Sequence, residues 1–286
     1  MVQDRTWLSR MFDWFNHGFL SLIAVLTVLP FTYVIVSSFA TMDDWVPKKF
    51  TFSAYQYIFS TNTFLRSLQV SVFITVVGTA LSLLFTSLTA YALSNKQLPG
   101  RRGFMLLILF TMFFSGGMIP TYFVVRSVGL LNSLWSLMIP GMISAYYLII
   151  LKSFFQQLPE ELKESAKIDG CHELGIVWRI ILPLSLPAMA AFGLFYAVGL
   201  WNQYFSAILY INDSTKWPVQ VLLRQIVVLS SGGFGDSSQV SQDNIAFYGQ
   251  SIKMAVVVVA TVPILLVYPF LQKHFAKGVL LGSIKE

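Results

Sequence analysis

The stretch "SLQVSVFITVVGTALSLLFTSLTAYALSN", residues 67–95, contains no Asp, Glu, Lys or Arg. A helix needs about 20 consecutive apolar residues to cross the hydrocarbon core of a bilayer. Lipid offers no partner for backbone N–H and C=O groups, so a helix is favoured because it satisfies them within the segment. A β-barrel would instead show segments of about ten residues with alternating polarity. The stretch therefore predicts a membrane-spanning helix.

Further stretches of the chain also lack charged residues. Of the 286 residues, 56% are hydrophobic and only 11% are charged, whereas soluble domains carry about 25% charged residues. We expect an all-α membrane protein with one domain over residues 1–286. The uncharged stretches, Trp14–Met42, Ser67–Asn95, Gly103–Val125, Ser127–Leu151, Ile180–Asn212 and Met254–Gln272, predict six spans over residues 17–40, 68–94, 104–124, 133–153, 183–209 and 254–272.

The distribution of Lys and Arg predicts the orientation of these spans. With six spans both termini lie on one side, and that side carries more Lys and Arg than the other. The positive-inside rule therefore places both termini in the cytoplasm. We interpret the net charge of +6 as this topological signal and expect no nucleic-acid partner. The first span is too long for a signal peptide and is expected to remain as an anchor.

Cysteine and histidine usage gives no sign of a disulfide framework or a metal site. Cys171 is the single cysteine, so no disulfide can form within the chain. The histidines, His17, His172 and His274, lack metal-ligand spacing. Within the third predicted span, the "SGGMIP" at residues 115–120 is expected to break or kink the helix, because Gly and Pro weaken helix interiors.

A polar segment, "LPEELKESAKIDG" at residues 158–170, lies on the predicted cytoplasmic side. Pro159 suits the first position of a helix, Glu160 and Glu161 favour its first turn, and Gly170 is a natural stop. A helix of about ten residues would be roughly 15 Å long and marginal alone in water. These residues leave two interpretations open: an amphipathic helix at the membrane surface, or a helix that docks into a partner.

The spacing within residues 164–183 resembles the EAA loop of ABC importer permeases. That loop has the pattern E-A-A-x3-G-x9-I-x-L-P, and only Ser165 departs from it here. The resemblance implies an ABC importer permease (MetI-like) fold with a cytoplasmic coupling helix between spans 4 and 5, in a loop over 154–182. The residues it implies in coupling to an ATPase are Glu164, Ser165, Ala166, Asp169, Gly170, Ile180, Leu182 and Pro183.

Other segments resemble carbohydrate-uptake permeases. "SLTAYALSNKQLPGRR" and "GLWNQYFSAILY" are similar to the smaller permease of the maltose system. "KGVLLGSIKE" and the stretch from "FFSGGMIP" onward are closer to permeases for complex saccharides, including uronate-containing oligosaccharides and alginate. The resemblance implies a bacterial cytoplasmic (inner) membrane protein that imports oligo- or polysaccharide. Its partners would be a second, related permease, two ATP-binding cassette subunits, an external solute-binding protein, the saccharide and the lipid bilayer.

Two groups of residues are candidates for contact with the cargo. In the fifth span, aromatic faces can pack on sugar C–H surfaces and amides can bond hydroxyls, although helix packing explains the same residues. In the external loop, glycines allow close approach of the backbone to the binding protein, although a flexible loop has the same composition. The substrate-path candidates are Trp201, Asn202, Gln203 and Tyr204; the binding-protein candidates are Gly232, Gly233, Phe234 and Gly235.

The sequence also bears on catalysis. It contains no Gly-Lys pair and hence no phosphate-binding G-x4-G-K-[ST] loop, so ATP and Mg²⁺ are expected on separate subunits and no cofactor on this chain. The sequence also lacks an H-E-x-x-H motif, which would have indicated an intramembrane enzyme. An ion-coupled secondary transporter of small polar solutes remains the alternative, although such proteins commonly carry ionisable residues within their spans. The tail at residues 278–286 resembles one that reaches the ATPase dimer, but a frayed terminus is equally compatible.

Overall fold

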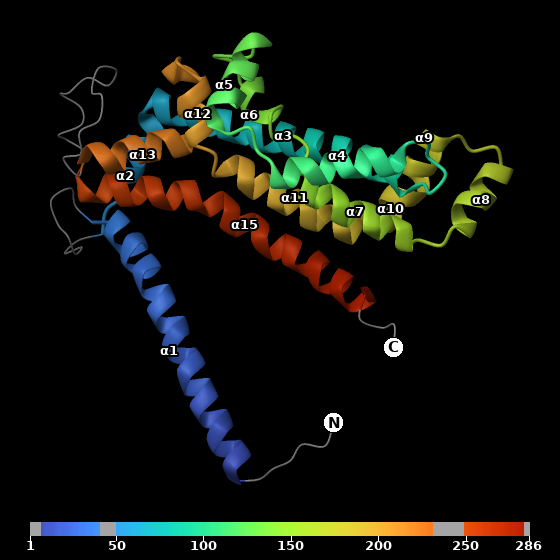
Figure 1. Ribbon diagram of the computed structural model, residues 1–286. Coiled ribbons are helices and arrows are strands. Elements are labelled where there is room, and N and C mark those ends of the chain that lie inside the picture. The colour runs from blue at the N-terminus through green and yellow to red at the C-terminus, as the bar shows by residue number, and fades with distance from the viewer. Residues whose placement is uncertain (1–6, 41–49, 231–248, 283–286) are drawn as a thin grey trace. The chain divides into compact units, whose positions relative to one another are not determined.

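The computed structural model describes residues 7–40, 50–230 and 249–282, and all regular secondary structure in these ranges is helical (Figure 1). Side chains are described over residues 7, 9–40, 50–227 and 249–267. The chain forms two compact units: Met1–Thr61 with Leu223–Thr261, and Asn62–Leu222 with Val262–Glu286. Each is described by itself, and the single domain over residues 1–286 stays a prediction.

The first unit begins with a long apolar helix, α1 (Trp7–Ser38). Its side chains are mostly exposed, as expected for a helix whose surroundings are lipid or a partner. After α1 the chain turns into α2 (Ser53–Ser60). The Oγ of Ser38 lies 2.7 Å from the hydroxyl oxygen of Tyr55, which fixes the start of α2 against the end of α1. The unit also contains most of α13 (Val219–Ser230) and the first part of α15 (Gln250–Gly282).

The second unit is built around α3 (Asn62–Ser94), which packs along α7 (Ala145–Gln157) and α11 (Leu186–Trp201) (Figure 1). Gly78 permits close packing between α3 and α11, because a Cβ there would lie 2.7 Å from a methyl carbon of Leu200. The buried hydroxyl of Tyr196 joins all three elements. Its oxygen lies 2.8 Å from Thr86 Oγ1 of α3, and it accepts a hydrogen bond from the backbone N–H of Ser144, which precedes α7.

Shorter helices complete this second unit. They form the stretch between α3 and α7, the polar loop after α7, and the loop after α11. Their bounds are α4 (Arg101–Phe113), α5 (Met118–Ser127), α6 (Trp135–Met138), α8 (Glu161–Ile168), α9 (Glu173–Ile176), a π-helical turn η1 (Val177–Ile181), α10 (Leu182–Leu184), α12 (Phe205–Tyr210) and a 3₁₀ turn η2 (Ser214–Lys216).

The described residues contain three helices that are long and apolar enough to cross a membrane, Ser9–Ser38, Asn62–Ser94 and Gln250–Val267. A fourth span is reached if the pair Glu173–Leu184 and Leu186–Trp201, which is bent by 85°, counts as one. The third predicted span is instead divided. The break predicted in "SGGMIP" is confirmed, since α4 ends at Phe113, α5 begins at Met118, and Gly117 has a φ of +85°.

Candidate coupling site

Helix α8 forms inside the segment that carries the EAA-like spacing. Glu161 and Glu164 occupy its first turn, where carboxylates interact favourably with the helix dipole. It is shorter than predicted: Leu158 is extended, as a residue before proline prefers, and the helix starts at Glu161 instead of Pro159. Gly170 follows the helix with a φ of +77°, a conformation that glycine adopts without steric cost. The predicted stop is therefore confirmed.

One face of α8 packs on the core of the second unit through a small residue. Ala166 is the buried residue of this helix and packs in a cluster with Leu151, Phe155 and Ile176. Ile180 packs against the same cluster. The two halves of the EAA-like pattern therefore meet in one apolar cluster. Ala166, one of the predicted coupling residues, therefore contacts its own chain.

Two apolar side chains of α8 are not covered by the described residues: Ile168, two positions after Ala166 and so on the other side of the helix, and Leu162, one turn before Ala166 and so at the edge of the same face. The side chain of Ile168 is 86% exposed and that of Leu162 is 40% exposed. Glu164, Ser165 and Asp169 are also exposed around them. Exposed apolar side chains rimmed by polar residues are typical of a protein–protein contact. Ile168 and Leu162 were not among the predicted coupling residues; the signal for them was two apolar residues within an otherwise polar segment.

A chain of polar contacts joins α8 to the last turn of α3 through α9. Lys167 of α8 forms an ion pair with Glu173 of α9, with 2.7 Å between Nζ and Oε1. The hydroxyl of Tyr91, on α3, donates a hydrogen bond of 2.6 Å to the other carboxylate oxygen, Oε2. The ammonium of Lys163 lies 5.8 Å from the centroid of the Tyr91 ring, in the geometry of a cation–π contact. These contacts were not predicted.

A polar hollow of about 120 Å³ lies beside these contacts, between α8 and the end of α3. Its lining includes Gln156, whose side-chain amide donates a hydrogen bond to the carbonyl of Ser94. The hollow also includes Glu160 and Glu164 in its wall. The side of α8 that faces α3 is therefore hydrophilic, whereas Ala166 faces an apolar cluster.

The last part of the EAA-like pattern forms the corner between the loop and α11. Ile180 lies in the π-helical turn η1, and Leu182 and Pro183 lie in α10. The chain then bends by 85° at Ser185. Pro183 and Pro187 fit this corner because proline lacks the N–H that would continue a straight helical ladder. The pattern thus specifies both α8 and the corner that leads to the span.

The substrate-path candidates lie at the end of α11. Trp201 is 4% exposed and lines an apolar hollow of about 210 Å³ together with Val72, Val76 and Pro263. The amide of Asn202 donates a hydrogen bond to the carbonyl of Val198, in the preceding turn. Gln203 is half-buried, and Tyr204 is 39% exposed. Trp201 thus has the surroundings of a packing residue, and contact of these four residues with substrate stays a prediction.

Two predicted contacts fall where the structure says nothing. The binding-protein candidates, Gly232, Gly233, Phe234 and Gly235, lie outside the described residues. So does the end of the tail, residues 283–286. Within the described residues, no group of three or more His, Cys, Asp or Glu side chains could hold a metal ion.

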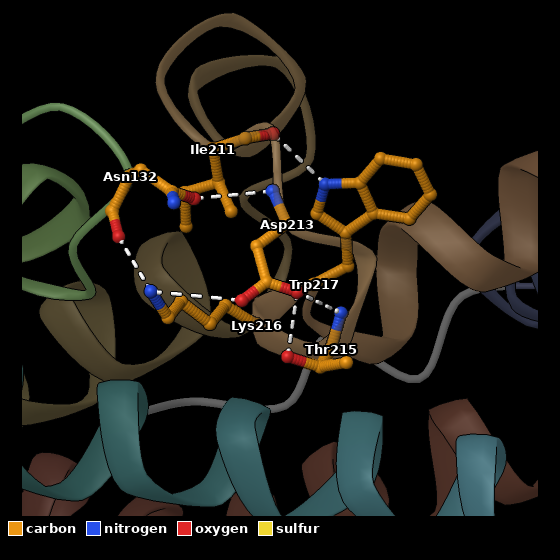
Figure 2. A network of polar contacts seen from close by, with 6 residues as sticks. All are labelled: Asn132, Ile211, Asp213, Thr215, Lys216 and Trp217. Carbon is orange, nitrogen blue, oxygen red and sulfur yellow. Dashed lines mark hydrogen bonds and ion pairs between the residues drawn. The ribbon is translucent and has the colours of Figure 1, made fainter. Parts of the chain in front are cut away.

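The far end of the second unit holds a polar network that we call the clasp, made of Asn132, Asp213, Thr215 and Lys216 (Figure 2). The side-chain oxygen of Asn132 accepts a hydrogen bond from the backbone N–H of Asp213. Lys216 donates a 2.9 Å hydrogen bond to the carbonyl of Asn132 and lies 3.6 Å from the Asp213 carboxylate. The hydroxyl and the backbone N–H of Thr215 both donate to Asp213, and these hydrogen bonds lower the pKa of its carboxyl group.

The clasp closes the loops that precede α6 and follow α12. Asn132 has a φ of +56°, and its own N–H bonds the carbonyl of Tyr210. Beyond the clasp, the indole N–H of Trp217 bonds the carbonyl of Ile211 (Figure 2). The N–H of Val219 bonds the hydroxyl of Ser71, on the first half of α3. The clasp was not predicted from the sequence.

Comparison with known proteins identifies the family. The family model described as "Binding-protein-dependent transport system inner membrane component" matches residues 69–281. The chain belongs to this family. It is an all-helical ABC importer permease of the bacterial inner membrane that spans the bilayer more than once, and ATP is bound and hydrolysed by separate subunits. The family and permease fold predicted from the EAA-like spacing are confirmed, and the secondary transporter is excluded.

The permease is similar over most of its length to proteins of saccharide transport. It is 59% identical to the polygalacturonan/rhamnogalacturonan transport system permease protein YtcP of Bacillus subtilis, over 97% of this chain and 99% of that protein. It is 29% identical to the diacetylchitobiose uptake system permease protein NgcG of Streptomyces coelicolor, over 97% of this chain and 90% of that protein. It also matches a solved structure, that of a bacterial ABC transporter involved in the import of the acidic polysaccharide alginate. The TM-score is 0.85 and the identity 29%, over 94% of this chain and 98% of that chain.

Proposed function

We propose that the permease imports acidic saccharides of the polygalacturonan or rhamnogalacturonan type. The observation that carries this proposal is the 59% identity to YtcP over nearly the full length of both chains. Similarity to the transporter of alginate, which is also an acidic polysaccharide, supports the same substrate class. The chain's own outer cations add little. Arg126 is exposed, but Lys216 is already engaged in the clasp.

The permease is one of two non-identical membrane subunits in this proposal. Together they enclose the path, two ATPase subunits bind on the cytoplasmic face, and an external binding protein delivers the saccharide. The chain crosses the membrane six times with both termini in the cytoplasm. Three spans are the long helices, the bent pair that ends in α11 is a fourth, and the broken helices α4 with α5, and α6 with α7, supply the remaining two.

Helix α8 is the part of the permease that docks into the ATPase. Its exposed Ile168 and Leu162 would enter a cleft of the ATPase, and Glu164 would meet a cation there. Ala166 contributes by seating α8 on the core, and Gly170 by ending the helix where the chain must turn. ATP bound to the ATPase can shift the permease between two global states only if the two proteins interact differently in each state. In this proposal the contact with α8 is the interaction that differs.

ATP hydrolysis by the assembled complex tests the substrate proposal. The complex is purified through a tag on this chain, after co-expression with its genomic neighbours, and the external binding protein is added with saccharides of three kinds. We expect galacturonate-containing oligosaccharides to raise ATPase activity more than alginate oligosaccharides, and neutral oligosaccharides to have no effect. Stimulation by neutral oligosaccharides alone would contradict the substrate class.

The single cysteine tests the topology. Cys171 is half-buried in the loop that we place in the cytoplasm. A membrane-impermeant maleimide should label it in permeabilised cells but not in intact cells. A Val128→Cys, Cys171→Ser variant provides the control, because Val128 is 61% exposed and is placed outside. Labelling of Cys171 in intact cells would contradict the proposed orientation.

A further inference from the structure

We propose that Tyr91 and Glu173 form a positioning link that fixes α8 to the end of α3, so that displacement of α8 by the ATPase reaches the spans. This inference rests on the proposed coupling role of α8. It assigns the task of transmitting that displacement to Tyr91 and to Glu173, neither of which is a fixed position of the EAA-like pattern.

The geometry of the link uses both oxygens of one carboxylate. Oε1 of Glu173 pairs with Lys167 of α8 at 2.7 Å, and Oε2 accepts the Tyr91 hydroxyl at 2.6 Å. Hydrogen bonds to an ionised group are shorter and stronger than those between neutral groups. Lys163 adds a second contact between α8 and α3, over the Tyr91 ring. The neighbouring helices α8 and α9 are thereby held to α3, which is distant in the sequence, by a continuous set of polar contacts.

Helix α8 has little else to hold it in place. Ala166 is its buried residue, and one methyl group provides only a small apolar anchor. A helix of eight residues is also marginal by itself in water. Pulling or tilting α8 would therefore slide it over the core unless a lateral contact resisted the movement. The link supplies that contact on the polar side of α8, beside the face that meets the apolar cluster.

Helix α3 is suited to carry the displacement further. It is continuous from Asn62 to Ser94 and packs along both α7 and α11. Tyr91 and Ser71 lie about 30 Å apart along it, at 1.5 Å per residue. Ser71 bonds the backbone of Val219 just beyond the clasp. A contiguous network of side-chain contacts and one continuous helix therefore connects the two ends of the second unit.

The first test removes one hydroxyl group. Tyr91→Phe deletes the hydrogen bond to Glu173 and keeps the ring beneath Lys163. In proteoliposomes containing the complete complex, we expect the amount of saccharide transported per ATP hydrolysed to fall about three- to tenfold, while ATPase still co-purifies. Tyr146→Phe is the matched control, because Tyr146 is 57% exposed and its hydroxyl has no hydrogen bond to the described residues. The control should keep the wild-type ratio.

Cys171 reports the position of the loop independently of transport. It lies between α8 and α9 and packs against the cluster that contains Ala166. Tyr91→Phe should raise its rate of maleimide labelling in the purified complex, whereas Tyr146→Phe should not. Glu173→Gln should act similarly. The double variant Tyr91→Phe, Glu173→Gln should be little worse than the more impaired single variant, because both disrupt one link.

Two outcomes separate failure of the link from failure of the coupling role. If Tyr91→Phe keeps the wild-type transport ratio and Cys171 labelling rate while Ile168→Asp releases the ATPase, the link is overturned and the docking role of α8 stands. If Ile168→Asp also leaves ATPase bound in full amount, the docking role itself is overturned. The link is supported if Tyr91→Phe lowers the transport ratio and speeds labelling of Cys171 while the control Tyr146→Phe does neither.

Discussion

The two ends of the second unit differ in how their polar and apolar groups are satisfied. At the clasp, Asn132, Asp213, Thr215 and Lys216 bond one another, and Trp217 bonds a nearby carbonyl (Figure 2). At the other end, α8 uses Lys167 and Ala166 internally but leaves Ile168 exposed. The polar groups of the clasp bond one another within the chain, whereas α8 keeps an exposed apolar side chain. This contrast is what we expect between a structural loop and the docking element that we propose.

The largest expected effect comes from breaking the turn after α8. Gly170→Pro cannot keep a φ of +77° and loses the N–H that bonds the carbonyl of Lys167, so the loop must rearrange. We expect the variant to insert into the membrane but to lose transport and bound ATPase.

Gly129 provides a matched control for this prediction. It has a φ of +72°, bonds the carbonyl of Arg126 in the same way, and lies near the clasp. Gly129→Pro should retain ATPase on co-purification. Equal loss of ATPase from both variants would remove the proposed difference between the two ends.

The next largest effect concerns the exposed face of α8. Ile168→Asp replaces an apolar side chain that would be buried against the ATPase, and burial of such a side chain contributes about 1.5–3 kcal/mol. Glu164→Lys reverses the charge expected to meet a cation. Each should reduce ATPase co-purification about tenfold or more. Val128→Asp, a similar change at the other end, should have no such effect; equal recovery from all three would contradict docking through α8.

A smaller effect is expected at the clasp. Lys216→Met removes the hydrogen bond to the Asn132 carbonyl and the charge beside Asp213. Because Lys216 is 38% exposed, solvent weakens the contribution, and we expect a loss of about 0.5–1 kcal/mol in the free energy of unfolding. Thermal unfolding of the purified complex measures this loss. ATPase co-purification should remain unchanged, since the proposed topology places the clasp on the side of the membrane away from the ATPase.

The smallest effect is the pH dependence of the Asp213 contacts. The hydrogen bonds from Thr215 lower the pKa of Asp213 below its ordinary value of 3.8. A lowered pKa contributes stability that is present above the unfolded-state value and is lost as the pH falls through the folded-state value. The melting temperature of wild type should therefore exceed that of Asp213→Asn slightly at pH 7, and the gap should close below about pH 4. A gap that widened on acidification would show the opposite sign.

Features that depend on local sequence could be predicted, and features that depend on distant pairing could not. A few neighbouring residues set each of the local features, which are the EAA-like spacing, the stop at Gly170 and the helix break before Met118. The Tyr91–Glu173 hydrogen bond instead joins residues 82 positions apart. The clasp likewise joins Asn132 to Asp213 across 81 positions. No pattern in either short segment indicates its partner, because the packing of α3 against its neighbours creates the pairing.

Ile168 was missed for a different reason. Its position in a short polar segment is compatible with burial or exposure, and only the seating of Ala166 decides which side of α8 faces the core. Once Ala166 is placed inward, Ile168 remains exposed. The sequence therefore predicted a helix in this segment, which the structure contains, but not the exposed residue through which we propose that it docks.

The most direct test of the central claim is site-specific photo-crosslinking from α8. A benzoylphenylalanine residue at position 168 is compared with the same residue at position 128, in the assembled complex with activity confirmed. We predict that the ATPase subunit is trapped from position 168 and not from position 128. An active complex that yields no ATPase crosslink from position 168 would contradict docking of the permease through α8.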